Sequence, residues 1–224
     1  MDEDTLIERL KQQINTGKAP SENYDFVRQH ANRPVTTEDL IEAEAKLGFP
    51  LPPLLKRIYA EVGNGGFGPG YGLFKLTLDR SVDNEYDNAL VDTYLALHQT
   101  DDEVWSLSPG EESAEAHQPI EYPGQILMIC EWGCTIYSFL DCSSPEYRVL
   151  RKDHNYSLTE HVLECPSFLQ WLEAWLAGVP LFYSCLGETR EAWGHAVENW
   201  EQACEQAREE WEQVPKVMFY PLPA

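Results

Sequence analysis

The 224-residue sequence lacks several features that would assign it to familiar classes of protein. No apolar run approaches the roughly 18 residues of a membrane helix, and the longest, Ile126 to Cys130, has the length of a strand. The acidic N-terminus, Met1 to Asp4, lacks the positive region of a secretory signal, so the expected compartment is the cytoplasm. No C-x-x-C pair occurs among the six cysteines, which we therefore expect to be free thiols.

Motifs of catalysis are also lacking. The sequence has no Gly-x-Ser-x-Gly elbow and no His, Cys or carboxylate cluster with the spacing of a metal site. Gly63, Gly65 and Gly68 match a dinucleotide fingerprint by spacing, but a predicted helix precedes them where that motif needs a strand. Pro69 also prevents a helix from starting at the third glycine. We therefore expect no enzyme, no metal and no cofactor.

Positive charge is scarce. The formal net charge is −22, and residues 81–147 contain no Lys or Arg. This cation-free stretch carries fourteen acidic residues, which leaves a net charge of −8 for the rest of the chain. Such a surface repels nucleic acid and anionic membranes and attracts basic proteins. A second interpretation, that the acidity only keeps the chain soluble, stays open at this point.

Helical spacing of apolar residues predicts six helices. Their ranges are 4–14, 36–47, 53–62, 83–97, 166–177 and 184–214. In the second, Thr36 and Asp39 form a capping-box pattern, Gly48 marks the end, and the apolar positions are expected to face inward. Those inward positions are Leu40, Ile41, Ala43 and Leu47. The tryptophans of the last helix are expected to pack on the domain, with a role in partner binding as the alternative.

Strands are predicted at 125–130 and 135–140, joined as a hairpin, at 147–150 and near 158–162, with a shorter one around 104–107. The glycine-rich run 63–72 between the helices and these strands is incompatible with a helix or a regular strand, and Gly65, Gly66 and Gly133 suit turns with positive φ. Consecutive strands favour antiparallel pairing. The expected fold class is α+β, with a central, mainly antiparallel sheet flanked by helices and an added C-terminal helix.

Several of these residues together resemble the SUKH superfamily. The set Ile41, Glu44, Leu47-Gly48, Leu51-Pro52, Tyr59 and Asn64-Gly65-Gly66 is similar to its N-terminal signature of two helices, a Leu-Pro turn and an Asn-Gly-Gly loop. Residues 126–141, with Trp132-Gly133-Cys134 and Tyr137, are similar to its central hairpin. Phe168-Leu169 and Trp171-Leu172 are similar to its closing helix. The predicted division is an N-terminal helical extension at 1–33, a SUKH-like domain at 34–180, and a C-terminal helix at 181–224.

The resemblance implies a role without catalysis. Many bacterial members are immunity proteins that bind and neutralise a toxin, often a nuclease, and other members are regulatory interaction scaffolds. The first role predicts a basic toxin domain as the partner, with the chain acting as a monomer or weak dimer. The second is the alternative. The expected partner-binding residues are Asp83, Asp87, Asp101, Asp102, Glu103, Trp105, Glu111 and Glu112, with Trp105 as an aromatic anchor.

Overall fold

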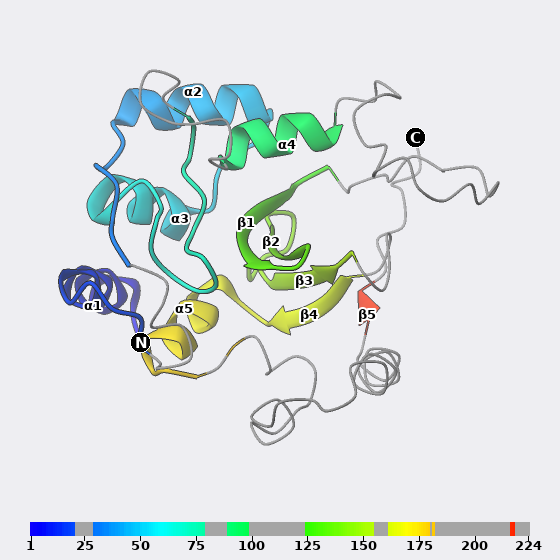
Figure 1. Cartoon of the computed structure of the whole chain (residues 1–224). Coiled ribbons are helices and arrows are strands. Elements are labelled where there is room, and N and C mark those ends of the chain that lie inside the picture. Colours follow the sequence, from blue (N-terminus) through cyan, green and yellow to red (C-terminus); the bar gives the residue numbers. More distant parts are fainter. Residues whose placement is uncertain are drawn as a thin grey trace, which may run out of the picture.

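The computed structural model describes residues 1–20, 29–78, 89–98, 124–154, 161–179, 181 and 216–217 (Figure 1). A five-stranded antiparallel sheet with its strands in chain order lies beside a group of helices. This arrangement confirms the predicted α+β class. The predicted helix over 184–214 and the predicted strand at 104–107 lie outside the described residues.

The first two helices both begin at a capping side chain, and the cap of the second is the predicted one. Helix α1 (Glu3–Asn15) starts at Asp2, whose side chain accepts a hydrogen bond from the Thr5 amide. Helix α2 (Thr37–Leu47) has a complete capping box between Thr36 and Asp39 and ends at Gly48 in the left-handed conformation. Three of the four predicted inward residues of α2 are buried, but Ile41 is 61% exposed and the prediction for it was wrong.

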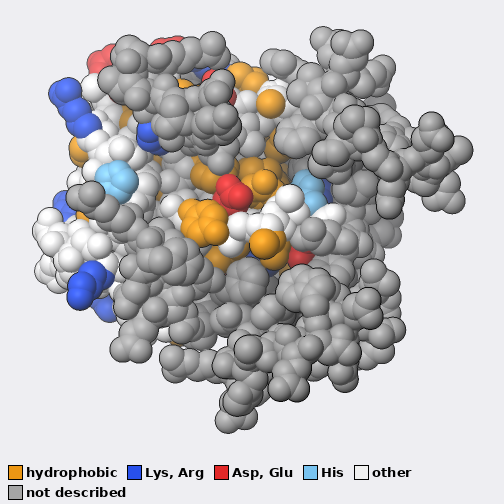
Figure 2. Space-filling model, in the orientation of Figure 1, with side chains coloured by type: hydrophobic (Ala, Val, Ile, Leu, Met, Phe, Trp, Pro, Cys, Tyr) orange, Lys and Arg blue, Asp and Glu red, His pale blue; other side chains and the backbone are white. Residues whose placement is uncertain are grey.

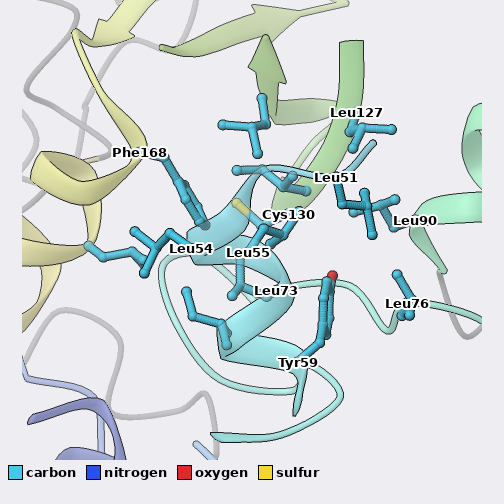
Figure 3. Close-up of a cluster of buried hydrophobic side chains, with 14 of the residues drawn as sticks. Leu51, Leu54, Leu55, Tyr59, Leu73, Leu76, Leu90, Leu127, Cys130 and Phe168 are labelled. Atoms are coloured by element: carbon cyan, nitrogen blue, oxygen red, sulfur yellow. The ribbon is translucent and has the colours of Figure 1, made fainter. Parts of the chain in front are cut away.

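Helix α3 (Pro53–Arg57) runs directly into a π-helical turn, η2 (Ile58–Val62). The predicted apolar stripe of this segment is buried as expected. Figure 3 shows Leu54, Leu55 and Tyr59 from this segment in one cluster of buried side chains with Cys130 and Phe168. The Tyr59 hydroxyl lies in the core, where it donates a hydrogen bond of 2.8 Å to the carbonyl of Phe74, and burial raises its pKa.

The glycine-rich loop, residues 63–72, crosses the molecule between the helices and the sheet. Its backbone pairs with the segment before α2 through Asn32, which donates to the Gly65 carbonyl at 3.2 Å and accepts from the Asn64 amide at 3.2 Å. At its other end the Tyr71 amide donates to the Glu131 carbonyl at 2.9 Å. The loop therefore connects the N-terminal segment to the first strand of the sheet.

The sheet is formed by β1 (Ile126–Gly133), β2 (Ile136–Asp141), β3 (Val149–Asp153), β4 (His161–Cys165) and β5 (Lys216–Val217). The predicted hairpin is confirmed, but its turn is tighter than the predicted four-residue connection. Cys134 and Thr135 form it with φ of 50° and 62°, after Gly133 at 88°. Positive φ at both central residues is the geometry that matches the twist of a two-residue hairpin. Positive φ at Gly65 and Gly66 also confirms those predictions.

Side chains of the sheet alternate between two apolar clusters. Leu127 and Ile129 of β1 belong to the main core, which lies between the sheet and the helices, whereas Ile126 and Met128 belong to a smaller cluster. A register shift between Met128 and Cys130 marks a bulge. Because of the bulge, Cys130 points into the main core together with its neighbour Ile129.

Helices α4 (Leu90–His98) and α5 (Phe168–Leu176) complete the described core. Helix α4 packs on β1 and α2, and residues 83–88 of the helix predicted here lie outside the described part. Helix α5 starts at Ser167, which caps it, and packs on α1. Leu6, Ile7 and Leu10 of α1 thus belong to the same core as the sheet. None of the helices in the described ranges is both long and apolar enough to cross a bilayer.

We predict that Gly65→Ala destabilises the fold strongly. A Cβ at Gly65 would lie 2.5 Å from the Leu73 carbonyl oxygen and 2.6 Å from that of Phe74, at a φ of +68°. Both atoms belong to backbone that cannot move aside cheaply. The free energy of unfolding should fall by at least about 3 kcal/mol, measured by urea denaturation with tryptophan fluorescence.

Gly48→Ala is the matched control for this prediction. Gly48 also has a positive φ, +79°, but a Cβ there would meet no described atom within 4 Å. This substitution should lower the free energy of unfolding only by the cost of a non-glycine residue in the left-handed conformation, about 1 kcal/mol. Equal effects of the two substitutions would show that the close approach at Gly65 contributes nothing.

Candidate partner-binding surface

All eight predicted partner-binding residues lie outside the described part of the chain. They are Asp83, Asp87, Asp101, Asp102, Glu103, Trp105, Glu111 and Glu112. The acidic contact surface therefore stays a prediction. The described part does place four other acids of the cation-free stretch, and these do not share one role.

Asp141 is the acid of this stretch whose role is internal. Its side chain is fully buried, and its carboxylate accepts a hydrogen bond of 2.8 Å from Arg148 Nε. The same carboxylate accepts from the amide and hydroxyl of Ser143. Asp141 therefore neutralises a cation of this chain and caps a turn after β2. It does not belong to a surface that could attract a partner.

Glu131 lies at the surface beside an exposed aromatic residue. Its pKa is raised by partial burial on β1, and its backbone carbonyl holds the amide of Tyr71, whose side chain is 49% exposed. On the face of the molecule in view, Figure 2 shows hydrophobic side chains gathered near the centre with an acidic side chain among them. Asp92 on α4 is half-buried and Glu146 is exposed. The described acids thus face different surroundings.

A buried polar network joins the four strands β1 to β4 to α5. The Glu164 carboxylate on β4 accepts hydrogen bonds from Arg151 Nη2 at 2.6 Å and Trp171 Nε1 at 2.7 Å. It also accepts from Ser138 Oγ at 2.5 Å, and that hydroxyl accepts from Trp132 Nε1 at 2.7 Å. Three donors around one buried carboxylate satisfy it without water. The network therefore fixes the sheet rather than exposing a reactive group.

Arg151 is held on several sides within this network. Its side chain is 2% exposed, and its guanidinium lies 4.6 Å from the ring centroid of Trp132. Its Nη2 also donates to the Leu181 carbonyl at 3.1 Å, which ties the segment after α5 to the sheet. Sequence reasoning missed this ion pair, because Arg151 and Glu164 stand in separate strands and no spacing rule relates them.

Three of the four described thiols, those of Cys130, Cys142 and Cys165, are poor candidates for nucleophiles, whereas Cys134 is exposed. Burial raises the pKa of Cys130 and of Cys142, so both stay protonated at neutral pH. Burial also raises the pKa of Cys165. Within the described ranges, no group of three His, Cys, Asp or Glu residues could hold a metal ion.

The concave sites of the described surface differ in size and lining. A cavity of about 10 Å³ next to Gln29, Trp132 and Leu181 has room for about one water molecule. A groove between α2 and the α3–η2 segment is much larger, about 320 Å³, and open to solvent. Its floor includes Leu40, Ile41 and Ala60. The groove is therefore the larger of these two sites, and its lining comes from two helical segments.

The fold and the buried network together define a class of protein. The chain is an α+β protein with an antiparallel sheet and a buried ion-pair network. Comparison with family models matches residues 34–174 to the SMI1 / KNR4 family (SUKH-1). This match covers more than half of the chain, and the chain therefore belongs to that family. No curated protein matches it.

We predict that Glu164→Gln lowers the free energy of unfolding by about 3–5 kcal/mol, because it leaves the buried Arg151 cation without its anion. Glu42→Gln is the control, since Glu42 and Lys46 form an exposed pair at 2.8 Å one helical turn apart. Loss of that pair should cost at most about 0.5 kcal/mol. Urea denaturation of both variants decides the question, and equal costs would contradict a structural role for the network.

A second prediction concerns pH. Burial lowers the pKa of His154 to about 4, with a smaller contribution from the charge of Lys152. An unfolded histidine titrates near 6.5, so from about pH 6.5 down to 4 the unfolded chain binds a proton that the folded chain does not. Stability should therefore fall with pH in this window. His154→Asn should remove on the order of 1 kcal/mol of that loss between pH 6.5 and 5.

Urea denaturation of both proteins at pH 7 and at pH 5 checks this expectation. The comparison uses the difference between wild type and variant, because other acids and histidines titrate in both. A variant whose stability falls as much as that of the wild type would contradict a buried, neutral His154.

Proposed function

We propose that this chain binds and neutralises a basic bacterial toxin domain, of the nuclease type, and catalyses no reaction of its own. The proposed site of action is the cytoplasm, where the chain acts as a monomer or weak dimer. Nucleic acid and anionic membranes are not proposed as partners, because both are polyanions and the chain carries a net charge of −22.

The observation that carries this proposal is the concentration of charge in residues 81–147, which contain fourteen acids and no Lys or Arg. A nuclease holds phosphates with basic residues, so an acidic inhibitor can occupy the same site as a polyanion mimic. Membership of the SMI1 / KNR4 family supports a role in binding, since immunity proteins are a theme of that family. The raised pKa values of the Cys130 and Cys142 thiols agree with a role that needs no nucleophile.

The proposed contacts are divided by what they contribute. The proposed contact acids are Asp83, Asp87, Asp101, Asp102, Glu103, Glu111 and Glu112. Acids at the rim of an interface mainly speed association, whereas Trp105 would supply an apolar anchor at its centre. Charge alone is screened at physiological salt, so the anchor is needed for a long-lived complex.

The proposal is tested by co-expressing the chain with a basic toxin domain encoded beside it and counting surviving cells. In purified form, the variant Asp101→Lys, Asp102→Lys, Glu103→Lys should associate with the toxin domain about tenfold more slowly or worse at low salt, because reversed charges repel a basic partner. Stopped-flow fluorescence at several salt concentrations measures this rate.

The matched control is Glu205→Lys, Glu209→Lys, Glu210→Lys, which changes the net charge equally but lies outside the cation-free stretch. It should slow association much less. Equal slowing by both variants would refute the proposed contact surface. Cells that die although they make the wild-type chain would refute neutralisation itself and favour the regulatory scaffold.

A further inference from the structure

The groove between α2 and the α3–η2 segment is an apolar hollow in an acidic surface. Leu40, Ile41 and Ala60 contribute apolar atoms, and the exposed part of its lining is mostly apolar. Its rim consists of two ion pairs, Lys56–Glu44 at 3.0 Å and Arg57–Glu61 at 2.8 Å. Its volume of about 320 Å³ lies at the lower end of the range of ligand pockets.

Ile41 is the unusual residue of this groove. It is 61% exposed, although its helix neighbours Leu40 and Ala43 are buried in the core. Helix α2 is already fixed by its capping box, its left-handed stop at Gly48 and its buried stripe. Folding therefore does not require an isoleucine at this position. A large exposed apolar side chain that lines a groove is a feature of binding surfaces.

The charges around the groove determine which sign of charge on a bound molecule is favoured. Every described cation near it is already paired: Lys46 with Glu42, Lys56 with Glu44, and Arg57 with Glu61 and Asp4. The acids outnumber these bases, since Arg57 alone pairs with three of them, Glu3, Asp4 and Glu61. Glu38, three residues before Ile41 on α2, is exposed and forms no ion pair among the described residues. The rim therefore carries excess negative charge.

This charge argues against several occupants. A second copy of the chain would bring another net charge of −22 to an acidic rim, and an anionic membrane would be repelled for the same reason. An apolar groove between two helices suits an amphipathic helix laid across it, which contacts the groove with side chains one turn apart. An occupant with cations beside its apolar stripe would satisfy both the floor and the rim.

We propose that this groove binds a basic amphipathic helix of the partner protein, with an apolar side chain inserted between Ile41 and Ala60. The inference rests on the proposed function, because it names the element of a basic partner that the chain holds. The groove supplies apolar burial, and the acidic rim pairs with lysines or arginines that flank the apolar stripe. Its lining residues all come from residues 37–61, outside the cation-free stretch of the sequence.

The test uses the full chain and a fluorescent leucine–lysine peptide of about 18 residues, which forms a helix about 27 Å long with one apolar face. Fluorescence anisotropy at about 0.15 M salt measures its affinity. Ile41→Gln should weaken binding about tenfold or more, because it removes apolar burial without changing charge. Ala60→Trp should weaken binding similarly, because it fills the groove from the opposite side.

Val179→Gln is the matched control, since Val179 is also an exposed aliphatic residue, at 42%, and lies outside the groove. Its affinity should equal that of the wild type. No measurable binding, or equal binding by all four proteins, would overturn the proposal, because attraction would then be diffuse and electrostatic. Loss of dimers in Ile41→Gln, seen by sedimentation without a change in peptide affinity, would also overturn it and assign the groove to self-association.

The peptide assay tests the groove and the survival assay tests neutralisation, so either proposal can be refuted while the other stands. Cells that survive the toxin with the wild-type chain and equally with Ile41→Gln and Ala60→Trp would leave neutralisation intact and remove the groove from it. Peptide binding that depends on Ile41, together with cells that die, would retain the groove and refute the toxin as its partner.

Discussion

The close approach of the glycine-rich loop to the backbone around it is the constraint on which the rest of the described structure depends. A Cβ at Gly63, Gly65 or Gly70 would lie less than 3 Å from neighbouring atoms, most of them in backbone. The loop can therefore pair with Asn32 on one side and with Glu131 on the other. The π-helical turn before it and the outer edge of β1 after it are held in one arrangement as a result. The α3–η2 wall of the groove runs directly into this loop.

The buried network around Glu164 makes the sheet a rigid body in the same way. One carboxylate receives donors from β2, β3 and α5, so strands distant in sequence cannot shift independently without exposing a buried charge. Replacing such a pair with apolar residues is often neutral for stability, so the gain is better sought in a fixed arrangement. A rigid platform loses little conformational entropy when a partner binds, which leaves more of the contact energy for affinity.

Local features of this fold could be predicted from the sequence, and features that depend on distant contacts could not. The capping box at Thr36 and the stop at Gly48 follow from backbone rules that act within a few residues. The exposure of Ile41 was missed, because helical periodicity cannot tell a core face from a groove. The turn at Cys134–Thr135 was missed because these residues rarely adopt positive φ. The Arg151–Glu164 pair depends on strand register, which no local pattern specifies.

The two proposed surfaces solve different parts of one recognition problem. Negative charge on a stretch without cations raises the rate of encounter with any basic protein, but it is screened by salt and does not distinguish one basic protein from another. Specificity needs a contact that costs free energy when the partner does not match. An apolar groove whose rim consists of ion pairs provides such a contact. A partner that lacks the matching apolar stripe would desolvate the ion pairs of Lys56 and Arg57 without compensation. A strongly acidic binding protein therefore depends on its apolar groove, more than on its charge, to select one partner.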